Sequence, residues 1–92
     1  MMVSMKEKEL EKILKALANK RRISILKYLK SESSASVGDI ADEIKLSFRA
    51  TSKHLMMLSR ADIVGKEQVS LTMVYGLEKE KHPIVQKLLE LF

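Results

Sequence analysis

Cysteine is absent from this sequence of 92 residues. Its absence excludes disulfides, thiolate metal ligands and thiol-based redox sensing. Aromatic residues make up only 4% of the chain, so the stacking platforms that bind single-stranded nucleic acid are scarce. No run approaches the roughly 18 apolar residues of a membrane span, and the N-terminal MMVSMKEKEL lacks the apolar core and cleavage site of a signal peptide. We therefore expect a cytoplasmic protein that does not enter a membrane.

The size and charge of the chain indicate which classes of partner it is suited to bind. A chain of this length is expected to form one domain over residues 1–92. Such a small domain buries a modest fraction of its surface, so an oligomer that shares its core would stabilise it. The formal net charge of +5 and the pI near 9.6 favour an anionic partner, although solubility alone can explain such a charge.

Hydrophobic spacing predicts helices through the first two thirds of the chain. A first helix, over about 6–18, has an apolar stripe at Leu10, Ile13, Leu14 and Leu17. Asn19 can cap a second helix that buries Ile25, Leu26 and Leu29. SESSAS at 31–36 has the composition of a loop. Ser36 and Ser47 then cap two short helices separated by about three residues, as in a helix-turn-helix. Their apolar faces are Val37, Ile40, Ala41 and Ile44 in one and Thr51, Leu55 and Leu58 in the other.

Past Asp62 the period of the pattern changes from that of a helix to that of a strand. Apolar residues occupy every second position at Val69, Leu71, Met73, Tyr75 and Leu77, and IVGKEQ before them can form the first arm of a hairpin. The turn is expected near Val69 and Ser70. Pro83 fits the first turn of a last helix over 83–92.

This order predicts a mainly α-helical domain with a small β-hairpin (α+β), the layout of a winged helix-turn-helix. Three stretches carry a closer likeness: LANKRRISIL at 17–26, VGDIADEIKLSFRATSKHLMMLSRADIV at 37–64 and MVYGL at 73–77. Together they resemble the ArsR family of small dimeric bacterial and archaeal repressors. The resemblance implies a transcriptional regulator, a repressor, that binds double-stranded DNA sequence-specifically as a homodimer on an imperfect palindrome. A dimeric protein-interaction module is the alternative from a different class.

The recognition helix of such a motif enters the major groove, so its exposed side needs hydrogen-bond donors and cations. Arg49 can contact a guanine with two hydrogen bonds, and serine and lysine can hold phosphates or base edges. The residues expected at the DNA interface are Ser47, Phe48, Arg49, Thr51, Ser52, Lys53, His54, Lys20, Arg21, Arg22 and Lys66.

Several of these residues have an alternative interpretation. Phe48 could touch a thymine methyl group, but packing against the first helix of the motif is favoured. His54 is expected to support the helix or reach a phosphate. The NKRR stretch could clamp a phosphate, or Arg22 could form an internal ion pair. Lys66 stands beside Glu67, so few wing contacts to DNA are expected, and an apolar wing tip is expected to be packed or exposed.

The two ends of the chain are expected to form the dimer. The apolar surface of the last helix exceeds what one side of a small domain needs, and an exposed apolar patch is unusual for a monomer. The expected interface residues are Leu10, Ile13, Leu14, Ile84, Leu88 and Leu91. No cofactor is expected. The metal sensing of known family members is not expected either, because cysteine is missing and His82 lacks suitably spaced ligands. No constellation indicates an enzyme.

Overall fold

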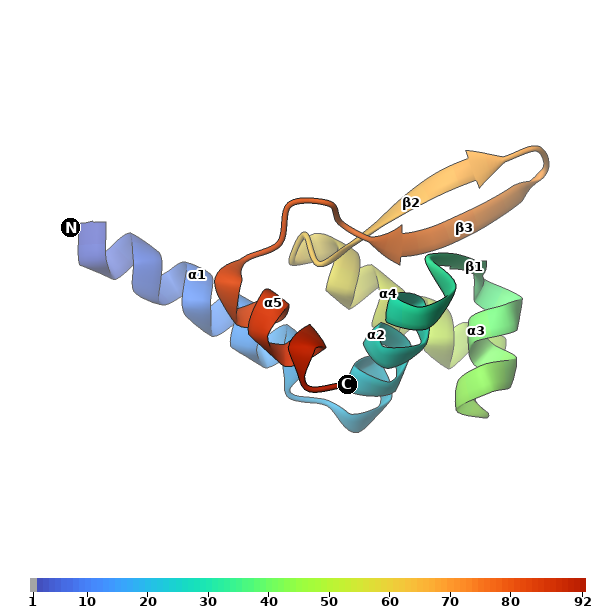
Figure 1. The fold of residues 1–92 in the computed structure, drawn as a ribbon, viewed down its shortest axis with the longest axis horizontal. Helices are drawn as coiled ribbons and strands as arrows, with labels where there is room; N and C mark the ends of the chain where they lie inside the picture. The colour runs from blue at the N-terminus through green and yellow to red at the C-terminus, as the bar shows by residue number, and fades with distance from the viewer. Residues whose placement is uncertain (1) are drawn as a thin grey trace.

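The computed structural model describes residues 2–92, with side chains from Lys6 onward. Within those residues the chain forms five helices and a three-stranded sheet, so the predicted winged helix-turn-helix is confirmed (Figure 1). The elements are α1 (Met2–Leu17), α2 (Lys20–Glu32), β1 (Ser34–Ser36), α3 (Val37–Ile44), α4 (Phe48–Arg60), β2 (Val64–Val69), β3 (Thr72–Leu77) and α5 (Pro83–Glu90). None of these helices is long and apolar enough to cross a bilayer.

Polar caps begin the helices where the sequence predicted them. The Asn19 side chain accepts hydrogen bonds from the backbone N–H groups of Arg21 and Arg22, at 2.9 and 3.1 Å. Ser36 and Ser47 each accept one from the residue three positions on, at 3.1 Å. These bonds satisfy N–H groups that have no partner inside a helix. His82 caps α5 through Nδ1, which accepts from the Ile84 N–H at 3.1 Å.

A short strand takes the place of part of the loop predicted at 31–36. Ser34–Ser36 pairs antiparallel with β3, so the sheet order is β1-β3-β2. Gly76 permits this pairing, because a Cβ there would lie 2.8 Å from the Ser33 carbonyl oxygen. A strand of three small residues has no hydrophobic alternation, which is why the sequence pattern did not reveal it.

The hairpin turn lies at Ser70 and Leu71, one residue later than predicted. Val69 therefore belongs to β2 and pairs with Thr72, and Leu71 lies in the turn rather than in a strand. Ser70 adopts a left-handed conformation with φ 59°. The alternation at Met73, Tyr75 and Leu77 does fall within β3.

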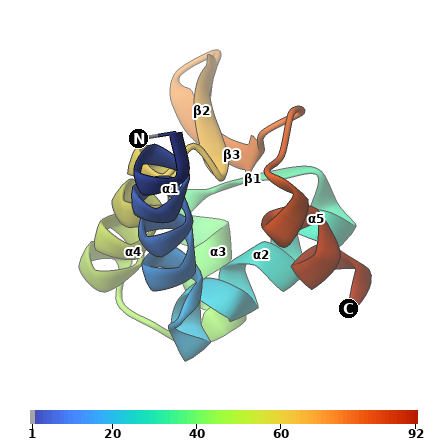
Figure 2. The ribbon, with the colours of Figure 1, turned by 90° about the vertical axis from the view of Figure 1, so that its left-hand side faces the viewer.

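The core is built around α2. Ile25, Leu26 and Leu29 of this helix are fully or nearly fully buried, and every other helix contributes to the same cluster. The remaining buried hydrophobic members are Ile13, Ala16, Leu17, Ala35, Ile40, Ile44, Leu55, Leu58, Ala61, Ile63, Val64, Val85 and Leu89. The N-terminal half of α1 extends beyond the rest of the domain, while α5 lies toward the same end of the molecule (Figures 1 and 2).

Candidate nucleic-acid interface

Helix α4 has one buried face and one cationic face. Thr51, Leu55 and Leu58 are completely buried against the core. About half a turn away, at the 3.6-residue period of a helix, the exposed side carries Arg49, Lys53, Met56 and Arg60. Every formally charged residue of this helix is positive, so its exposed face is suited to an anionic partner.

Thr51 is corrected from a DNA contact to a core residue. Its side chain has no exposed area, and its hydroxyl oxygen has no hydrogen-bond partner among the described residues. The spacing of Thr51, Leu55 and Leu58 at i, i+4 and i+7 places all three on one stripe. That stripe faces the domain, so this hydroxyl cannot reach a nucleic acid.

The N-terminal end of α4 is open to solvent. Ser47 uses its hydroxyl oxygen as the cap, and the positive end of the helix dipole lies here. Phe48, the first residue of the helix, is 62% exposed, so the favoured prediction that it packs against α3 is wrong. Leu46, in the turn between α3 and α4, packs against the core instead.

Arg22 is buried and holds α1 to α4. Its Nε donates to the Ala16 carbonyl, and its Nη2 donates to the Lys15 carbonyl at 3.1 Å. Its Nη1 lies 3.2 Å from His54 Nδ1 and 3.0 Å from the Met57 sulfur. These contacts satisfy carbonyls at the C-terminal end of α1, where a helix favours a cation. Arg22 is therefore corrected from a phosphate clamp to an internal residue, and its partners are carbonyls rather than the ion-pair carboxylate considered from the sequence.

His54 serves the same contact. Since an arginine can only donate, the Nδ1 of His54 accepts this hydrogen bond and must be unprotonated. Burial, followed by the positive charges of Arg22 and Arg21, lowers the pKa of the His54 imidazole below its usual value. His54 thus supports the α1–α4 contact as a neutral ring, one of the two roles expected of it.

Lys20 and Arg21 are the exposed cations of the same stretch. Arg21 donates from Nη1 to the Ile44 carbonyl at 2.8 Å, which ties α2 to the end of α3. The stretch predicted as one clamp therefore divides into one internal arginine and two exposed cations, of which one is held near the turn of the helix-turn-helix.

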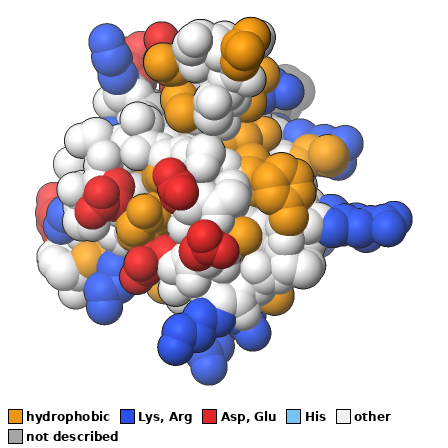
Figure 3. Space-filling model, turned by 90° about the vertical axis from the view of Figure 1, so that its right-hand side faces the viewer, with side chains coloured by type: hydrophobic (Ala, Val, Ile, Leu, Met, Phe, Trp, Pro, Cys, Tyr) orange, Lys and Arg blue, Asp and Glu red, His pale blue; other side chains and the backbone are white. Residues whose placement is uncertain are grey.

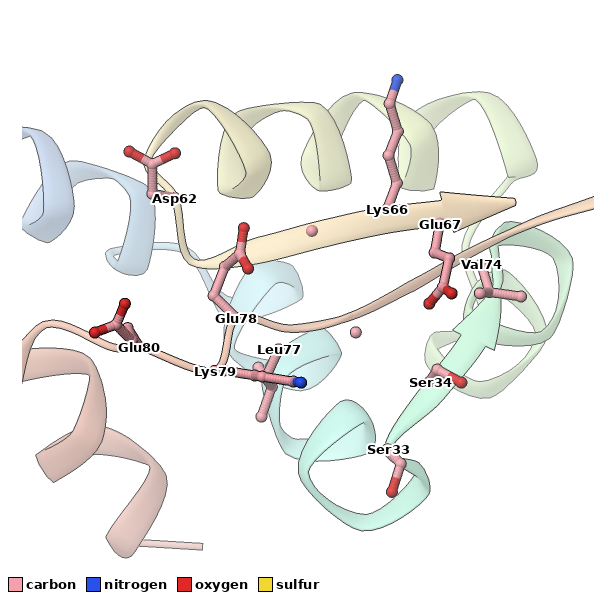
Figure 4. A pocket seen from close by; sticks show the side chains of 12 residues that line it. Ser33, Ser34, Asp62, Lys66, Glu67, Val74, Leu77, Glu78, Lys79 and Glu80 are labelled. Carbon is pink, nitrogen blue, oxygen red and sulfur yellow. The ribbon is translucent and has the colours of Figure 1, made fainter. Parts of the chain in front are cut away.

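The wing is the hairpin of β2 and β3, and Lys66 and Glu67 point to opposite sides of it (Figure 4). Lys66 is paired with Tyr75, whose ring packs against the core, whereas Glu67 is paired with Val74 on the outer side. Alternation along a strand separates these neighbours. The carboxylate therefore does not share the face of Lys66, an arrangement that the sequence order alone concealed.

The wing tip is apolar and exposed, one of the two outcomes expected for it. Leu71 is 95% exposed in the turn, and Val69 and Met73 beside it are also exposed.

On the outer side of the wing lies a cavity of about 600 Å³, bordered by the carboxylates of Asp62, Glu67, Glu78 and Glu80 (Figure 4). Within residues 2–92, no three histidine, aspartate or glutamate side chains are grouped so as to hold a metal ion.

Acidic residues lie on α3, the other helix of the motif. Asp39, Asp42 and Glu43 are all exposed. Burial, followed by the negative charges of Glu32, Asp39 and Glu43, raises the pKa of the Tyr28 phenol. Figure 3 shows acidic side chains gathered in the middle of this end of the molecule, with lysine and arginine side chains projecting from its edges. An anionic partner is therefore disfavoured over α3 and favoured over α4.

An apolar groove runs along the outer face of α1. Its volume is about 420 Å³, and its lining residues are Glu7, Leu10, Glu11, Leu14, Lys15 and Ala18. Leu14 is 50% exposed there. Ile13 is only 5% exposed and belongs to the core of the monomer, so its prediction as an interface residue is corrected. The i, i+3, i+4 spacing spans two faces, and Ile13 occupies the inner one.

Helix α5 divides its apolar residues between core and surface. Val85 and Leu89 are buried, and Ile84 and Leu88 are partly buried against the same cluster. Leu91 is 79% exposed just after the helix. Of the three residues predicted here for the interface, Leu91 therefore has by far the largest free surface.

Comparison with known proteins gives a family match. Residues 19–66 match a family model described as "Bacterial regulatory protein, arsR family". The transcriptional activator HlyU of Vibrio cholerae is 38% identical over 65 residues, which are 71% of this chain and 59% of that protein. The chain thus matches less than two thirds of the length of that curated relative.

Solved structures agree with this match. Reduced HlyU from Vibrio cholerae has a TM-score of 0.81 at 31% identity, covering 98% of this chain and 90% of that one. NolR from Sinorhizobium fredii has a TM-score of 0.82 at 27% identity, with coverage of 98% and 86%. A homodimeric winged helix-turn-helix DNA-binding domain from Mycobacterium bovis shares the fold, with a TM-score of 0.81 at 24% identity and coverage of 96% and 78%. The chain belongs to the arsR family of bacterial regulatory proteins.

Proposed function

We propose that this protein regulates transcription by binding double-stranded DNA through α4, as a homodimer on an imperfect palindrome. The observation that carries the proposal is the exposed face of α4, where Arg49, Lys53 and Arg60 project without any carboxylate on the same helix. The HlyU relative, named as a transcriptional activator, supports the same class of function.

The exposed residues divide into base-reading and phosphate-binding roles. Arg49 lies in the first turn of α4, where a recognition helix reaches base edges, and its fork of donors matches the O6 and N7 of guanine. Ser52 and Ser47 can donate to base edges or phosphates nearby. Lys53, Arg60, Lys66, Lys20 and Arg21 supply positive charge to the DNA backbone, which positions the domain without reading sequence.

The homodimer is supported by the groove of α1 and by the exposed Leu91. Leu10, Leu14 and Ala18 present an apolar face that has no cover within the described monomer. A two-fold axis would cover this face with its own copy, because a symmetric interface uses one surface twice. The Mycobacterium bovis domain with this fold is homodimeric. Two recognition helices held about 34 Å apart would meet successive major grooves, which requires a palindromic operator.

Repression is the direction that the resemblance implies, whereas the HlyU relative is named an activator. A dimer bound across a promoter blocks polymerase, so repression is expected where the operator overlaps the promoter. A reporter gene placed under the DNA upstream of the protein's own gene decides between repression and activation. Expression of the reporter should rise when the gene for this protein is deleted. A fall in expression on deletion would contradict repression while leaving DNA binding intact.

The DNA-binding experiment is fluorescence anisotropy with duplexes enriched from a random library, compared with unselected duplexes of the same length. Affinity should fall steeply with salt, because phosphate contacts release counterions. Lys53→Ala should reduce the salt dependence. Lys79→Ala makes the same charge change in the segment that follows β3, on the side of the sheet opposite α4, and it should leave the salt dependence unchanged (Figure 4).

If no duplex binds even at low salt, the DNA-binding proposal is overturned. A dimer that persists under those conditions would then support the alternative of a protein-interaction module. The two functions are therefore separated by one measurement of duplex affinity together with one of oligomeric state.

A further inference from the structure

Phe48 is an exposed aromatic ring at the reading end of α4. It is the first residue of the helix, with 62% of its surface free. Arg49 follows it, and Ser52 lies one turn further on the same side. An aromatic side chain buries a large apolar area when it finds a partner, so leaving this ring in water forgoes a substantial stabilisation. The core does not use it, since the turn contributes Leu46 instead.

The polar surroundings of Phe48 restrict what can cover it. Protein interfaces generally have an apolar centre from which charged residues are depleted. Phe48 is instead followed by Arg49 and lies on a helix whose charged residues are all positive. A partner that is anionic overall but carries a local apolar group fits both features. In the major groove of DNA, the 5-methyl group of thymine is such a group, and phenylalanine is among the residues that contact it.

We infer that Phe48 reads the methyl group of a thymine in each operator half-site. This inference rests on the proposed function and deepens it, because it names a base. The N-terminal residues of a recognition helix are the ones that reach base edges. Consecutive Cα atoms are about 3.8 Å apart and consecutive base pairs about 3.4 Å apart. The thymine should therefore lie within about two base pairs of the guanine contacted by Arg49.

The test removes one methyl group at a time from the DNA. Duplexes are enriched from a random library with the wild-type protein, and each thymine of the half-site is replaced in turn by deoxyuridine. At one position per half-site the dissociation constant should rise about fourfold, the change expected for one methyl-sized group returned to water. Symmetric replacement in both half-sites should raise it by about fifteenfold.

Protein variants then assign the methyl contact to a residue. Phe48→Ala should bind thymine and deoxyuridine duplexes equally, and Phe48→Leu should keep part of the difference. Met56→Ala is the matched control, because Met56 is also an exposed apolar residue of α4 but lies two turns further along. It should retain the full thymine preference. Phe48 makes no contribution to the core, so unchanged melting temperatures should accompany both alanine variants.

The possible results distinguish thymine recognition by Phe48 from DNA binding by the protein. If no duplex is enriched, the proposed function fails and the inference fails with it. If duplexes are enriched but no thymine shows a methyl dependence, Phe48 does not read thymine although DNA binding stands. A methyl dependence that survives Phe48→Ala, or disappears in Met56→Ala, also overturns the assignment.

Discussion

Helices α1 and α4 each bury one apolar stripe, but the charges on their exposed faces differ: α1 carries both signs, and α4 carries only positive formal charges. Helix α1 places Ile13 and Leu17 in the core and exposes Leu14 in an apolar groove. Helix α4 buries Leu55 and Leu58 and exposes only positive formal charges. Both buried stripes consist of aliphatic side chains that pack into the same core, and this packing establishes the fold. The exposed faces differ in chemistry and suit the two proposed partners, a second copy for α1 and DNA for α4.

Arg22 joins these two helices. It donates to the Lys15 and Ala16 carbonyls of α1 and contacts His54 and Met57 of α4. The face proposed for dimerisation and the face proposed for DNA are therefore held in one rigid relation. This relation matters because a palindrome can be read only if the dimer sets the spacing of the two recognition helices.

The largest expected effect comes from breaking the α1 face. Leu14→Glu places a carboxylate in the apolar groove, and both copies suffer the same change across a two-fold axis. We expect monomers by light scattering and a loss of operator affinity on the order of 1,000-fold, since each half-site must then bind alone. This position is cleaner than Leu88, which partly packs against the monomer's core.

Leu71→Glu is the matched control for the oligomeric state. It introduces the same side chain at an exposed leucine in the wing turn, at the far end of the molecule from α1 (Figure 1). It should remain a dimer. A Leu14→Glu protein that is still dimeric would refute the proposed role of the α1 groove.

The next largest expected effect, on stability, comes from removing the Arg22 contacts between α1 and α4. Arg22→Met removes the guanidinium donors and deprives the Ala16 carbonyl, in a buried setting, and the Lys15 carbonyl, in a partly buried one, of these hydrogen bonds. We expect the free energy of unfolding, measured with urea, to fall by about 3 kcal/mol. Arg21→Met removes one bond from an exposed side chain and should cost well under half as much. Equal effects of the two substitutions would contradict the buried connection.

A smaller expected effect distinguishes base contacts from phosphate contacts on the exposed face of α4. Arg49→Ala should reduce the preference for operator over random DNA by about 30-fold, within the range of 1–3 kcal/mol for a bidentate contact to guanine. Lys53→Ala should weaken both duplexes by the same factor, as loss of a phosphate contact does. Competition binding measures both. An unchanged operator preference in Arg49→Ala would remove its base-reading role.

The sequence predicted the features that depend on neighbours along the chain. Asn19, Ser36 and Ser47 cap helices because each side chain bonds an N–H two or three residues away. The stripe of Leu55 and Leu58 follows from helical period alone. Hydrophobic spacing supplied the order of elements, which the structure confirms apart from the added strand β1. The family match over residues 19–66 confirms the resemblance.

Features that depend on distant neighbours were missed or misassigned. Strand β1 exists because β3 lies beside it and Gly76 leaves room. Arg22 finds partners on two other helices: the Lys15 and Ala16 carbonyls of the preceding helix, and His54 and Met57 of α4, more than 30 residues further on. Thr51 counted both as a core residue and as a DNA contact, and only its complete burial separates the two. Phe48 was expected to pack against the first helix of the motif, but Leu46 packs against the core from the turn instead.

The smallest expected effect concerns pH and the His54 ring between the two faces. Burial and the nearby charges of Arg22 and Arg21 lower the pKa of His54 in the folded protein, whereas in the unfolded chain it should titrate near 6.5. The unfolded state therefore binds more protons just below that pH, and the free energy of unfolding should fall as pH falls from about 7 toward 5. Above about pH 7 the ring is neutral in both states, so His54 contributes no slope there.

Urea unfolding at a series of pH values measures this effect, and the two histidines provide matched variants. His54→Gln keeps a polar side chain beside Arg22 but cannot titrate, so the loss of stability between about pH 7 and 5 should largely disappear. His82→Asn removes the other histidine while keeping a side chain that can cap α5, and it should retain the loss. A pH dependence that survives unchanged in His54→Gln would contradict the assignment of this effect to His54. Such a result would mean that the Arg22–His54 contact between α1 and α4 does not depend on the charge of the imidazole.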